Sequence, residues 1–316
     1  MPPASASDGA LGAQFHTSGV ALHIAGIRVN IRTDVPHLPE QIQYMYSGHR
    51  FETAAGIDNF QIYLSYTNKL RRFVKRQTQV YVDGTTHFIP APERLSYISL
   101  ESALNWCISQ TLSNVVLHAA VVERDGVAVV LPAPSASGKS TLCAALVLRG
   151  WRLLSDELCV IRPQDGRLQP TARPISLKNE SIALIQRWAP DSQFSPLFAE
   201  TSRGTIAFLR PPAASVARAA EPAEPGLIVS PSWRADATPA LQSLGKSESF
   251  RLLAGNSLNY FATQRLGFET LAGLVDRCAS YRLSYATLAE AVETMETLLA
   301  RTLAARRRDG RAAATA

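Results

Sequence analysis

Short apolar runs separated by turn signals make up the first third of the chain. Residues 20–31 contain two such runs, and residues 79–82 and 85–89 flank the dipeptide Asp83-Gly84. Runs of this length are typical of strands, and Asp-Gly is typical of a tight hairpin turn. The pattern predicts a β-rich N-terminal domain over residues 19–94.

A helical period follows this domain. Apolar side chains recur at four-residue intervals at Leu100, Leu104, Ile108 and Leu112. A spacing of three or four residues places side chains on one face of an α-helix. We therefore expect a helix over residues 95–112 that links the N-terminal domain to the rest of the chain.

The remainder of the chain alternates between strand and helix patterns. Two β runs flank Asp125-Gly126, and an apolar helix pattern that ends at Gly150 follows them. Later segments continue the alternation with a strand at 227–229, a helix at 268–279, a strand at 281–285 and a helix at 287–303. Such alternation predicts an α/β domain, which we place over residues 113–303.

The two ends of the chain differ from the body. Residues 1–12 have no basic start and no apolar block, so we expect residues 1–18 to be a disordered leader and not a secretory signal. Residues 304–316 form a basic tail rich in alanine and arginine. Residues 301–316 hold five arginines and one aspartate and thus carry +4 of the net charge of +6, which leaves +2 for the body.

A net charge of +2 over residues 1–300 is not typical of a protein that binds polyelectrolytes. A basic cluster over residues 69–76 lies beside Tyr66 and contains Phe73, but it lacks a recognised RNA-binding signature, and we interpret it as a solvated surface. Nucleic acid is therefore not an expected partner. Binding of nucleic acid through this cluster and the tail stays a minor alternative, which predicts an affinity that falls steeply with salt.

The chain also lacks the marks of a membrane or secreted protein. No run approaches the roughly 18 consecutive apolar residues that a membrane-spanning helix requires. Cys107, Cys143, Cys159 and Cys278 are scattered among apolar residues without a CxxC pair, so we expect reduced core thiols and neither a disulfide frame nor a zinc site. These features predict a soluble, cytoplasmic protein.

One motif carries clear chemistry. Between the second β run and the helix pattern stands a loop that ends in Gly138-Lys139-Ser140, and strand, loop and helix in this order are the context of a Walker A phosphate loop. Its first position is Ala133 where the pattern has glycine, but a small residue still fits the turn. The predicted nucleotide-binding residues are Ala133, Pro134, Ser135, Ala136, Ser137, Gly138, Lys139, Ser140 and Thr141.

The chemistry of such a loop follows from its parts. Successive backbone N–H groups and the positive end of the helix dipole hold phosphates, and Lys139 reaches the β and γ oxygens. The Ser140 hydroxyl binds magnesium. The expected cofactors are therefore ATP and Mg²⁺. Because the sequence has no motif that would recognise the base, another phosphoryl donor stays open.

Two adjacent acids follow the loop. The apolar run from Trp151 ends in Asp156-Glu157, and Asp156 comes sixteen residues after Ser140, enough for one short helix and a return strand. Asp156 is thus expected beside the phosphate loop as a metal ligand. Adjacent side chains on an extended chain point in opposite directions, so only one of the two acids should face the nucleotide fully.

Four further polar residues have two interpretations each. His118 lies in the apolar run that precedes the loop, where it is either a core histidine bonded to backbone or a site residue. Arg173 and Lys178 stand in a segment after the acids, and Arg203 precedes a glycine. Each could place positive charge on a phosphoryl group or be ordinary surface charge.

Residues 117–161 resemble the catalytic domain of the bacterial HPr kinase/phosphorylase family. In that family a histidine-bearing strand, a hairpin, a phosphate loop, an Arg-Gly helix end and a strand ending in paired acids follow in this order. The whole chain resembles HprK-related kinase A, a family linked to exosortase and PEP-CTERM protein-sorting systems. The supporting segments are 173–179, 202–206, 257–260 and 282–285.

The resemblance implies roles for several residues. Gly138, Lys139 and Ser140 match the phosphate-loop positions, and His118 matches a histidine near the transferred phosphate. Asp156-Glu157 match a pair of aspartates that divide magnesium binding and acceptance of the serine proton, and which acid does which stays open here. Around Arg203, the Arg-Gly-x-Gly-Ile element of HPr kinases is only partly matched, so neither phosphorolysis nor HPr as substrate is predicted.

The prediction is an ATP-dependent serine/threonine protein kinase with an HPr-kinase-like P-loop domain behind a β-rich N-terminal domain. Its expected catalytic residues are Asp156, Glu157, His118 and Lys139, and its partner is a small protein or peptide that bears a hydroxyl. The alternative is an ATP-binding regulatory or assembly factor of a protein-sorting system with little or no phosphotransfer. The partner's identity, a homo-oligomer and the role of the N-terminal domain stay open.

Overall fold

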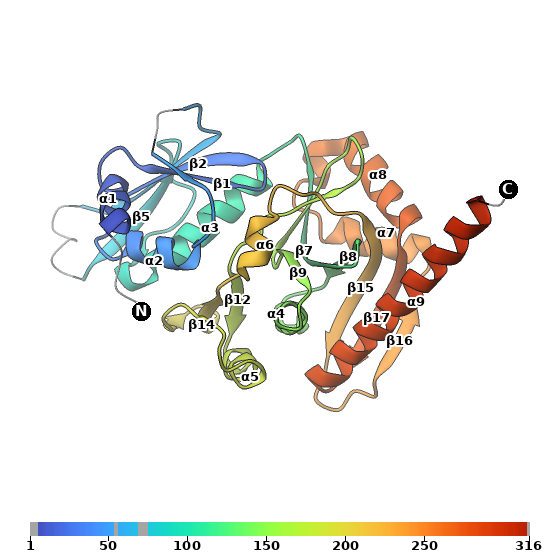
Figure 1. Ribbon diagram of the computed structural model, residues 1–316. Helices are drawn as coiled ribbons and strands as arrows, with labels where there is room; N and C mark the ends of the chain where they lie inside the picture. The colour runs from blue at the N-terminus through green and yellow to red at the C-terminus, as the bar shows by residue number, and fades with distance from the viewer. Residues whose placement is uncertain (1–5, 54–55, 69–74, 315–316) are drawn as a thin grey trace.

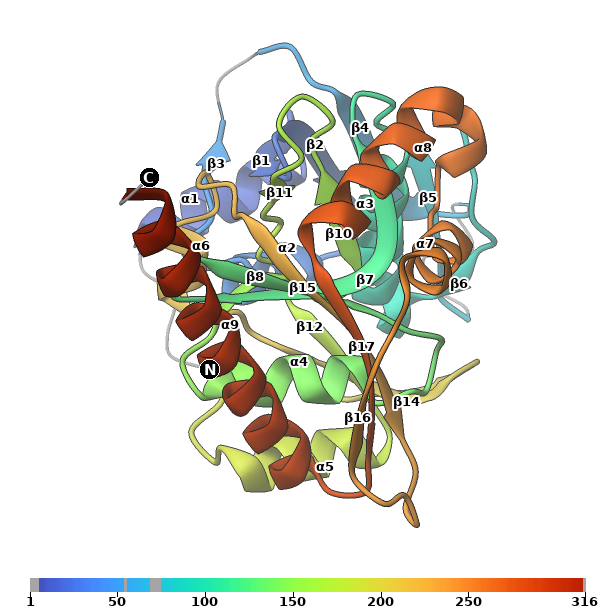
Figure 2. The same ribbon diagram turned by 90° about the vertical axis from the view of Figure 1, so that its right-hand side faces the viewer.

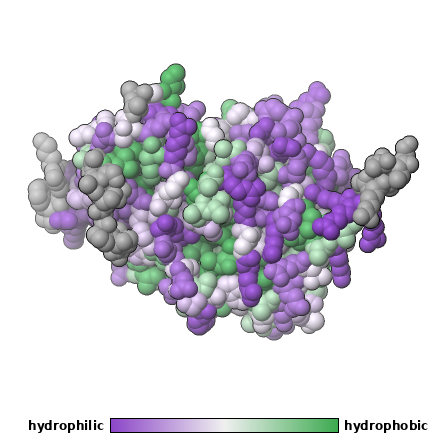
Figure 3. Space-filling model, in the orientation of Figure 1, coloured by the Kyte–Doolittle hydropathy of each residue, from purple (hydrophilic) through white to green (hydrophobic). Residues whose placement is uncertain are grey.

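The computed structural model describes residues 6–53, 56–68 and 75–314 of the 316-residue chain. Over these residues the fold is mixed α/β and contains three sheets, which lie side by side in Figure 1. Within the same residues no helix combines the length and apolar character needed to cross a bilayer. On the face shown in Figure 3, the outer side of the C-terminal helix is mainly hydrophilic.

The first sheet has the strand order β3-β1-β2-β4-β5-β6. One face packs against three helices, and together they form a single apolar core. The strands are β1 (Val20–Ile24), β2 (Ile27–Thr33), β3 (Phe51–Glu52), β4 (Phe60–Tyr66), β5 (Gln77–Val82) and β6 (Ala91–Pro92), and the helices are α1 (Ala6–Phe15), α2 (Leu38–Met45) and α3 (Ser96–Ser109).

Two sequence predictions differ from the structure in this region. The expected disordered leader is a helix from Ala6 onward, because Phe15 is fully buried against the sheet and packs edge-on against Phe51. The predicted hairpin partner at 85–89 is not a strand. The Gln79 side chain donates hydrogen bonds to Thr86 Oγ1 and the Phe88 carbonyl, and β5 pairs with β4 and β6 instead. Most of the basic cluster lies outside the described residues.

The second sheet has the order β11-β10-β7-β8-β15-β17-β16, with β9 also paired to β7. Strands β8, β15 and β17 run parallel at its centre. The strands are β7 (Val115–Arg124), β8 (Val127–Pro132), β9 (Arg152–Ser155), β10 (Leu158–Ile161), β11 (Leu168–Gln169), β15 (Pro225–Trp233), β16 (Ala240–Ser243) and β17 (Ala279–Tyr285).

Helices cover both faces of this sheet. As Figures 1 and 2 show, α4 (Lys139–Leu148) and α9 (Leu288–Ala314) lie on one side, whereas α7 (Lys246–Gly255) and α8 (Tyr260–Arg277) lie on the other. Each side has its own apolar cluster. The four cysteines are buried and unpaired, as the sequence predicts.

The third sheet joins the other two. It consists of β12 (Ile175–Lys178), β14 (Gly204–Leu209) and β13 (Phe198–Thr201), with α5 (Glu180–Trp188) and α6 (Ala213–Ala217) beside it. Side chains alternate between the faces of a strand, and here both faces are apolar. Ile206 and Phe208 pack into the core of the first sheet, whereas Ala207 and Leu209 pack into the cluster around α4.

We predict that Phe208 is central to this junction. The ring lies edge-on to both Tyr97 and Phe198, with centroids 5.2 and 6.0 Å away, and is 5% exposed. Phe208→Ala should lower the free energy of unfolding by about 3 kcal/mol, because the cavity opens between two packed units. Urea unfolding measures the change, and Phe208→Leu should lose less. An Ala variant that unfolds at the wild-type urea midpoint would contradict this packing role.

Candidate active site

The loop between β8 and α4 lies at the carboxyl ends of the parallel strands, where open α/β sheets bind ligands. The Trp233 N–H donates to the Ser137 carbonyl over 3.0 Å, and the Tyr285 hydroxyl donates to the Gly138 carbonyl over 3.3 Å. Gly138 has φ 87°, and a Cβ there would lie 2.3 Å from the Tyr285 oxygen. Only glycine fits this position.

The other loop residues have different surroundings. Ala133 is fully buried, in keeping with a small residue at the end of β8. Pro134, Ser135 and Ala136 are exposed, and Ser140 and Thr141 are half-buried in the first turn of α4. The Ser137 hydroxyl is buried and has no hydrogen-bond partner among the described residues. An unpaired buried hydroxyl in such a loop is free to bind a phosphate oxygen.

Lys139 and His118 meet beside the loop. Lys139 is buried, and its Nζ lies 3.0 Å from His118 Nε2. Burial and the charge of Lys139 lower the pKa of His118, so the imidazole is neutral and accepts this hydrogen bond. Burial also lowers the pKa of Lys139, against the opposing charges of Asp156 and Glu157. The structure therefore brings His118 to the loop, although its backbone N–H also bonds the Asn256 carbonyl.

A break in strand pairing places the two acids. β9 and β10 pair with the same edge of β7, where Ser155 lies opposite Val121 and Leu158 opposite His118. Asp156 and Glu157 fall in the gap between the two strands. The Ser155 hydroxyl accepts a hydrogen bond from the Leu158 N–H over 2.9 Å, which closes the turn. Glu157 therefore lies close enough to His118 to act on its pKa, and both acids act on the pKa of Lys139.

Asp156 is only 3% exposed, yet only one of its two carboxylate oxygens has a hydrogen-bond partner among the described residues. Oδ2 accepts a hydrogen bond from the Ser176 N–H over 3.1 Å, whereas Oδ1 has no hydrogen-bond partner among the described residues. Burial raises the pKa of Asp156 from 3.8 to about 6, although Lys139 and the Ser140 hydroxyl lower it. A buried carboxylate oxygen without a partner, near a serine hydroxyl, suits an oxygen-seeking cation such as Mg²⁺.

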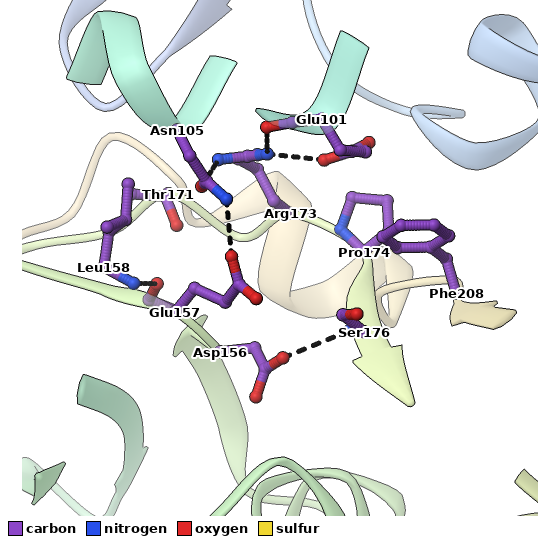
Figure 4. Close-up of a pocket in the computed structure, with 11 residues that line it drawn as sticks. Glu101, Asn105, Asp156, Glu157, Leu158, Thr171, Arg173, Pro174, Ser176 and Phe208 are labelled. Atoms are coloured by element: carbon purple, nitrogen blue, oxygen red, sulfur yellow. Dashed lines mark hydrogen bonds and ion pairs between the residues drawn. The ribbon is translucent and has the colours of Figure 1, made fainter. Parts of the chain in front are cut away.

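Glu157 has a different environment. Its carboxylate accepts a hydrogen bond from the Asn105 amide on α3, as Figure 4 shows. Burial alone would raise the pKa of Glu157, but the charges of Arg173, Lys139 and Lys178 together with this hydrogen bond hold it below its usual range. Glu157 is thus ionised at neutral pH and oriented by a residue of the N-terminal part of the chain.

Arg173 belongs to a buried network instead of lying free in a loop. Its guanidinium donates to the Glu101 carboxylate and main-chain carbonyl, to the Asn105 amide oxygen and to the Tyr46 hydroxyl. Figure 4 shows Asn105 between Arg173 and Glu157. A direct contact of Arg173 with phosphate stays a prediction, since all of these bonds are to protein groups.

Sequence reasoning missed Asn105, Glu101 and Tyr46. A signal was present, because Glu101 and Asn105 stand four residues apart on a helix whose other polar residues, apart from Tyr97, are serines. Such a pair projects from one face and requires partners when that face is buried.

Lys178 and Arg203 complete the positive charge around the site. Lys178 ends β12 half-buried, and Arg203 lies exposed in the turn between β13 and β14. Both charges contribute to the lowered pKa of His118, after burial and Lys139. The Asn179 side chain accepts from the Thr205 N–H and donates to the Arg203 carbonyl, which fixes this turn. Contact of either cation with substrate stays a prediction.

Comparison with known proteins gives little further information. No family model and no curated protein matches the chain. Among solved structures, the Hpr(Ser) kinase/phosphatase from Coxiella burnetii is similar at 15% identity and a TM-score of 0.25, over 59% of this chain and 98% of that chain. A likeness at this TM-score decides neither fold nor function, so the interpretation of the site rests on its own geometry.

We predict that the ionised carboxylate of Asp156 lowers the free energy of unfolding at neutral pH. The folded state keeps this proton up to about pH 6, whereas an unfolded aspartate releases it near its ordinary pKa of 3.8. Stability is therefore lost as the pH rises between these values, by on the order of 3 kcal/mol. In EDTA, Asp156→Asn should unfold at a higher temperature than the wild type at pH 7.5, with no gain near pH 3.5. Exposed Asp191→Asn is the control, and equal shifts in both variants would contradict the assignment.

Proposed function

We propose that the protein is an ATP-dependent phosphotransferase that acts on a serine or threonine hydroxyl of a small protein or peptide, as the resemblance to HPr kinases implies. The observation that carries the proposal is the meeting of Lys139, His118 and the two acids at one loop. Lys139 Nζ lies 3.0 Å from His118 Nε2, and both acids act on the pKa of Lys139. Phosphoryl transfer requires such positive charge and carboxylates around the γ-phosphate.

The loop would hold the nucleotide. Backbone N–H groups at the start of α4 and the unpaired Ser137 hydroxyl would bind the phosphates, and Lys139 would bind the β and γ oxygens. Ser140 and Asp156 would hold Mg²⁺, because the free Oδ1 of Asp156 supports that role. When bound, Mg²⁺ supplies positive charge that neutralises the β- and γ-phosphate oxygens.

The environments of the two acids divide their roles. Asp156 is the metal ligand, since it is close enough to Ser140 for the hydroxyl to lower its pKa. Glu157 is the general base, because it is ionised and held by Asn105. Its carboxylate accepts the proton of the acceptor hydroxyl while that oxygen bonds to the γ-phosphorus and ADP leaves. Neutral His118 holds the Lys139 ammonium by accepting its hydrogen bond.

An ATP-binding regulatory or assembly factor would need only Lys139 and Ser140. A base oriented by its own hydrogen bond has no task in such a factor, which favours the kinase. A protein partner and a place in a sorting system rest on the resemblance alone, and the partner's identity and a homo-oligomeric state stay open.

The first test is labelling. Purified protein with γ-labelled ATP and Mg²⁺ should transfer label to a protein in lysate from a bacterium that carries an exosortase system, and Lys139→Ala should abolish the transfer. The mass of the labelled band identifies the partner. If ATP binds but neither protein nor water takes its phosphate, the kinase proposal fails and the nucleotide-gated factor replaces it.

The second test separates the acids. Glu157→Gln should bind Mg-ATP like the wild type and lose about 100-fold to 10,000-fold in phosphotransfer rate, because only the proton acceptor is removed. Asp156→Asn should lose the magnesium dependence of ATP binding. Isothermal titration calorimetry and single-turnover labelling measure both, with exposed Glu180→Gln as control. The reverse pattern would exchange the two roles.

A further inference from the structure

A large aromatic side chain stands exposed beside the loop. Trp233 ends β15 and is 48% exposed, although tryptophan is usually well buried. Its indole Nε1 donates to the Ala286 carbonyl over 2.9 Å, and its backbone N–H donates to the Ser137 carbonyl over 3.0 Å. The indole ring is therefore exposed but fixed in position, and the backbone of the same residue is hydrogen-bonded to the loop.

Trp233 is also in close contact with the glycine of the loop. A methyl group at Gly138 would lie 3.0 Å from Trp233 Cβ. The tryptophan thus borders the start of α4, where the phosphates of a nucleotide would be held. A ligand that extends from the loop toward β15 would meet the indole within the length of a nucleoside.

The strand order indicates which end of a nucleotide points there. β7 carries His118 and β9 leads to Asp156, and both strands lie on one side of β8. β15 and β17 lie on the other side. The γ-phosphate must lie among Lys139, His118 and the acids for transfer to occur. The nucleoside then leaves the loop on the opposite side, toward the ends of β15 and β17.

From this arrangement we infer that the exposed face of the Trp233 indole is the stacking platform for the base of the bound nucleoside triphosphate. The inference rests on the nucleotide binding of the proposed function, but it does not need phosphotransfer. Stacking uses the face of a base and not its edge, so this subsite accepts purines in general and favours them over smaller pyrimidines.

The test compares a nucleotide with its phosphates alone. Calorimetry should show that Trp233→Ala weakens ATP binding about tenfold while the affinity for inorganic tripolyphosphate stays unchanged, since only the base loses its platform. Trp233→Phe should retain most of the ATP affinity. Trp188→Phe is the matched control, because Trp188 stacks on Arg149 at the far end of α4 from the loop.

A second measurement does not depend on the Ala variant. In the wild type, ATP should quench the part of the tryptophan emission that comes from Trp233, which is the part missing from Trp233→Phe. ATP should also protect this emission from quenching by acrylamide. Tripolyphosphate should have neither effect. The inference is overturned if Trp233→Ala weakens ATP and tripolyphosphate equally, or weakens neither. If the wild type binds tripolyphosphate but no nucleotide, the inference also fails. If the wild type binds neither ATP nor tripolyphosphate, the proposed function is overturned as well.

Discussion

The site depends on one long strand that pairs with two short strands along the same edge. β7 is hydrogen-bonded to β9 and then to β10, and Asp156 and Glu157 lie between these two partners, where the Glu157 carbonyl still accepts a hydrogen bond from the Ala119 N–H. An uninterrupted strand would turn the two side chains to opposite faces of the sheet. With the break, both acids act on Lys139, which the sequence of β8, loop and α4 brings to within 3.0 Å of His118.

Burial makes this site electrostatically incomplete without a ligand. Lys139 and Asp156 both have pKa values shifted toward their neutral forms, because each is largely removed from water. Glu157 escapes this shift because the charges of Arg173, Lys139 and Lys178 and the hydrogen bond from Asn105 counter its burial. In the proposed kinase, phosphate and a divalent cation would supply the missing charges and make this arrangement favourable. The groups that burial destabilises would then gain the most from ligand binding.

The sequence predicted the loop, the strand that leads to the acids and the final succession of helix, strand and helix in α8, β17 and α9, because these depend on local patterns. It did not predict α5, α7 or the third sheet. It could not predict the environment of Arg173, whose partners Tyr46 and Glu101 are far away along the chain. It also missed the helix at the N-terminus, since Phe15 is ordered by a distant strand and not by its neighbours. Tertiary contacts, which a single sequence does not reveal, decide both cases.

The third sheet explains why the N-terminal part of the chain matters to the site. Because β14 is apolar on both faces, the first sheet and its helices are held against the unit that contains the loop. α3 can then present Glu101 and Asn105 to Arg173 and Glu157. If the first sheet served only to recognise a partner, no side chain from it would need to reach the acids. The hydrogen bond from Asn105 to Glu157 instead makes this region part of the catalytic apparatus in the proposed kinase.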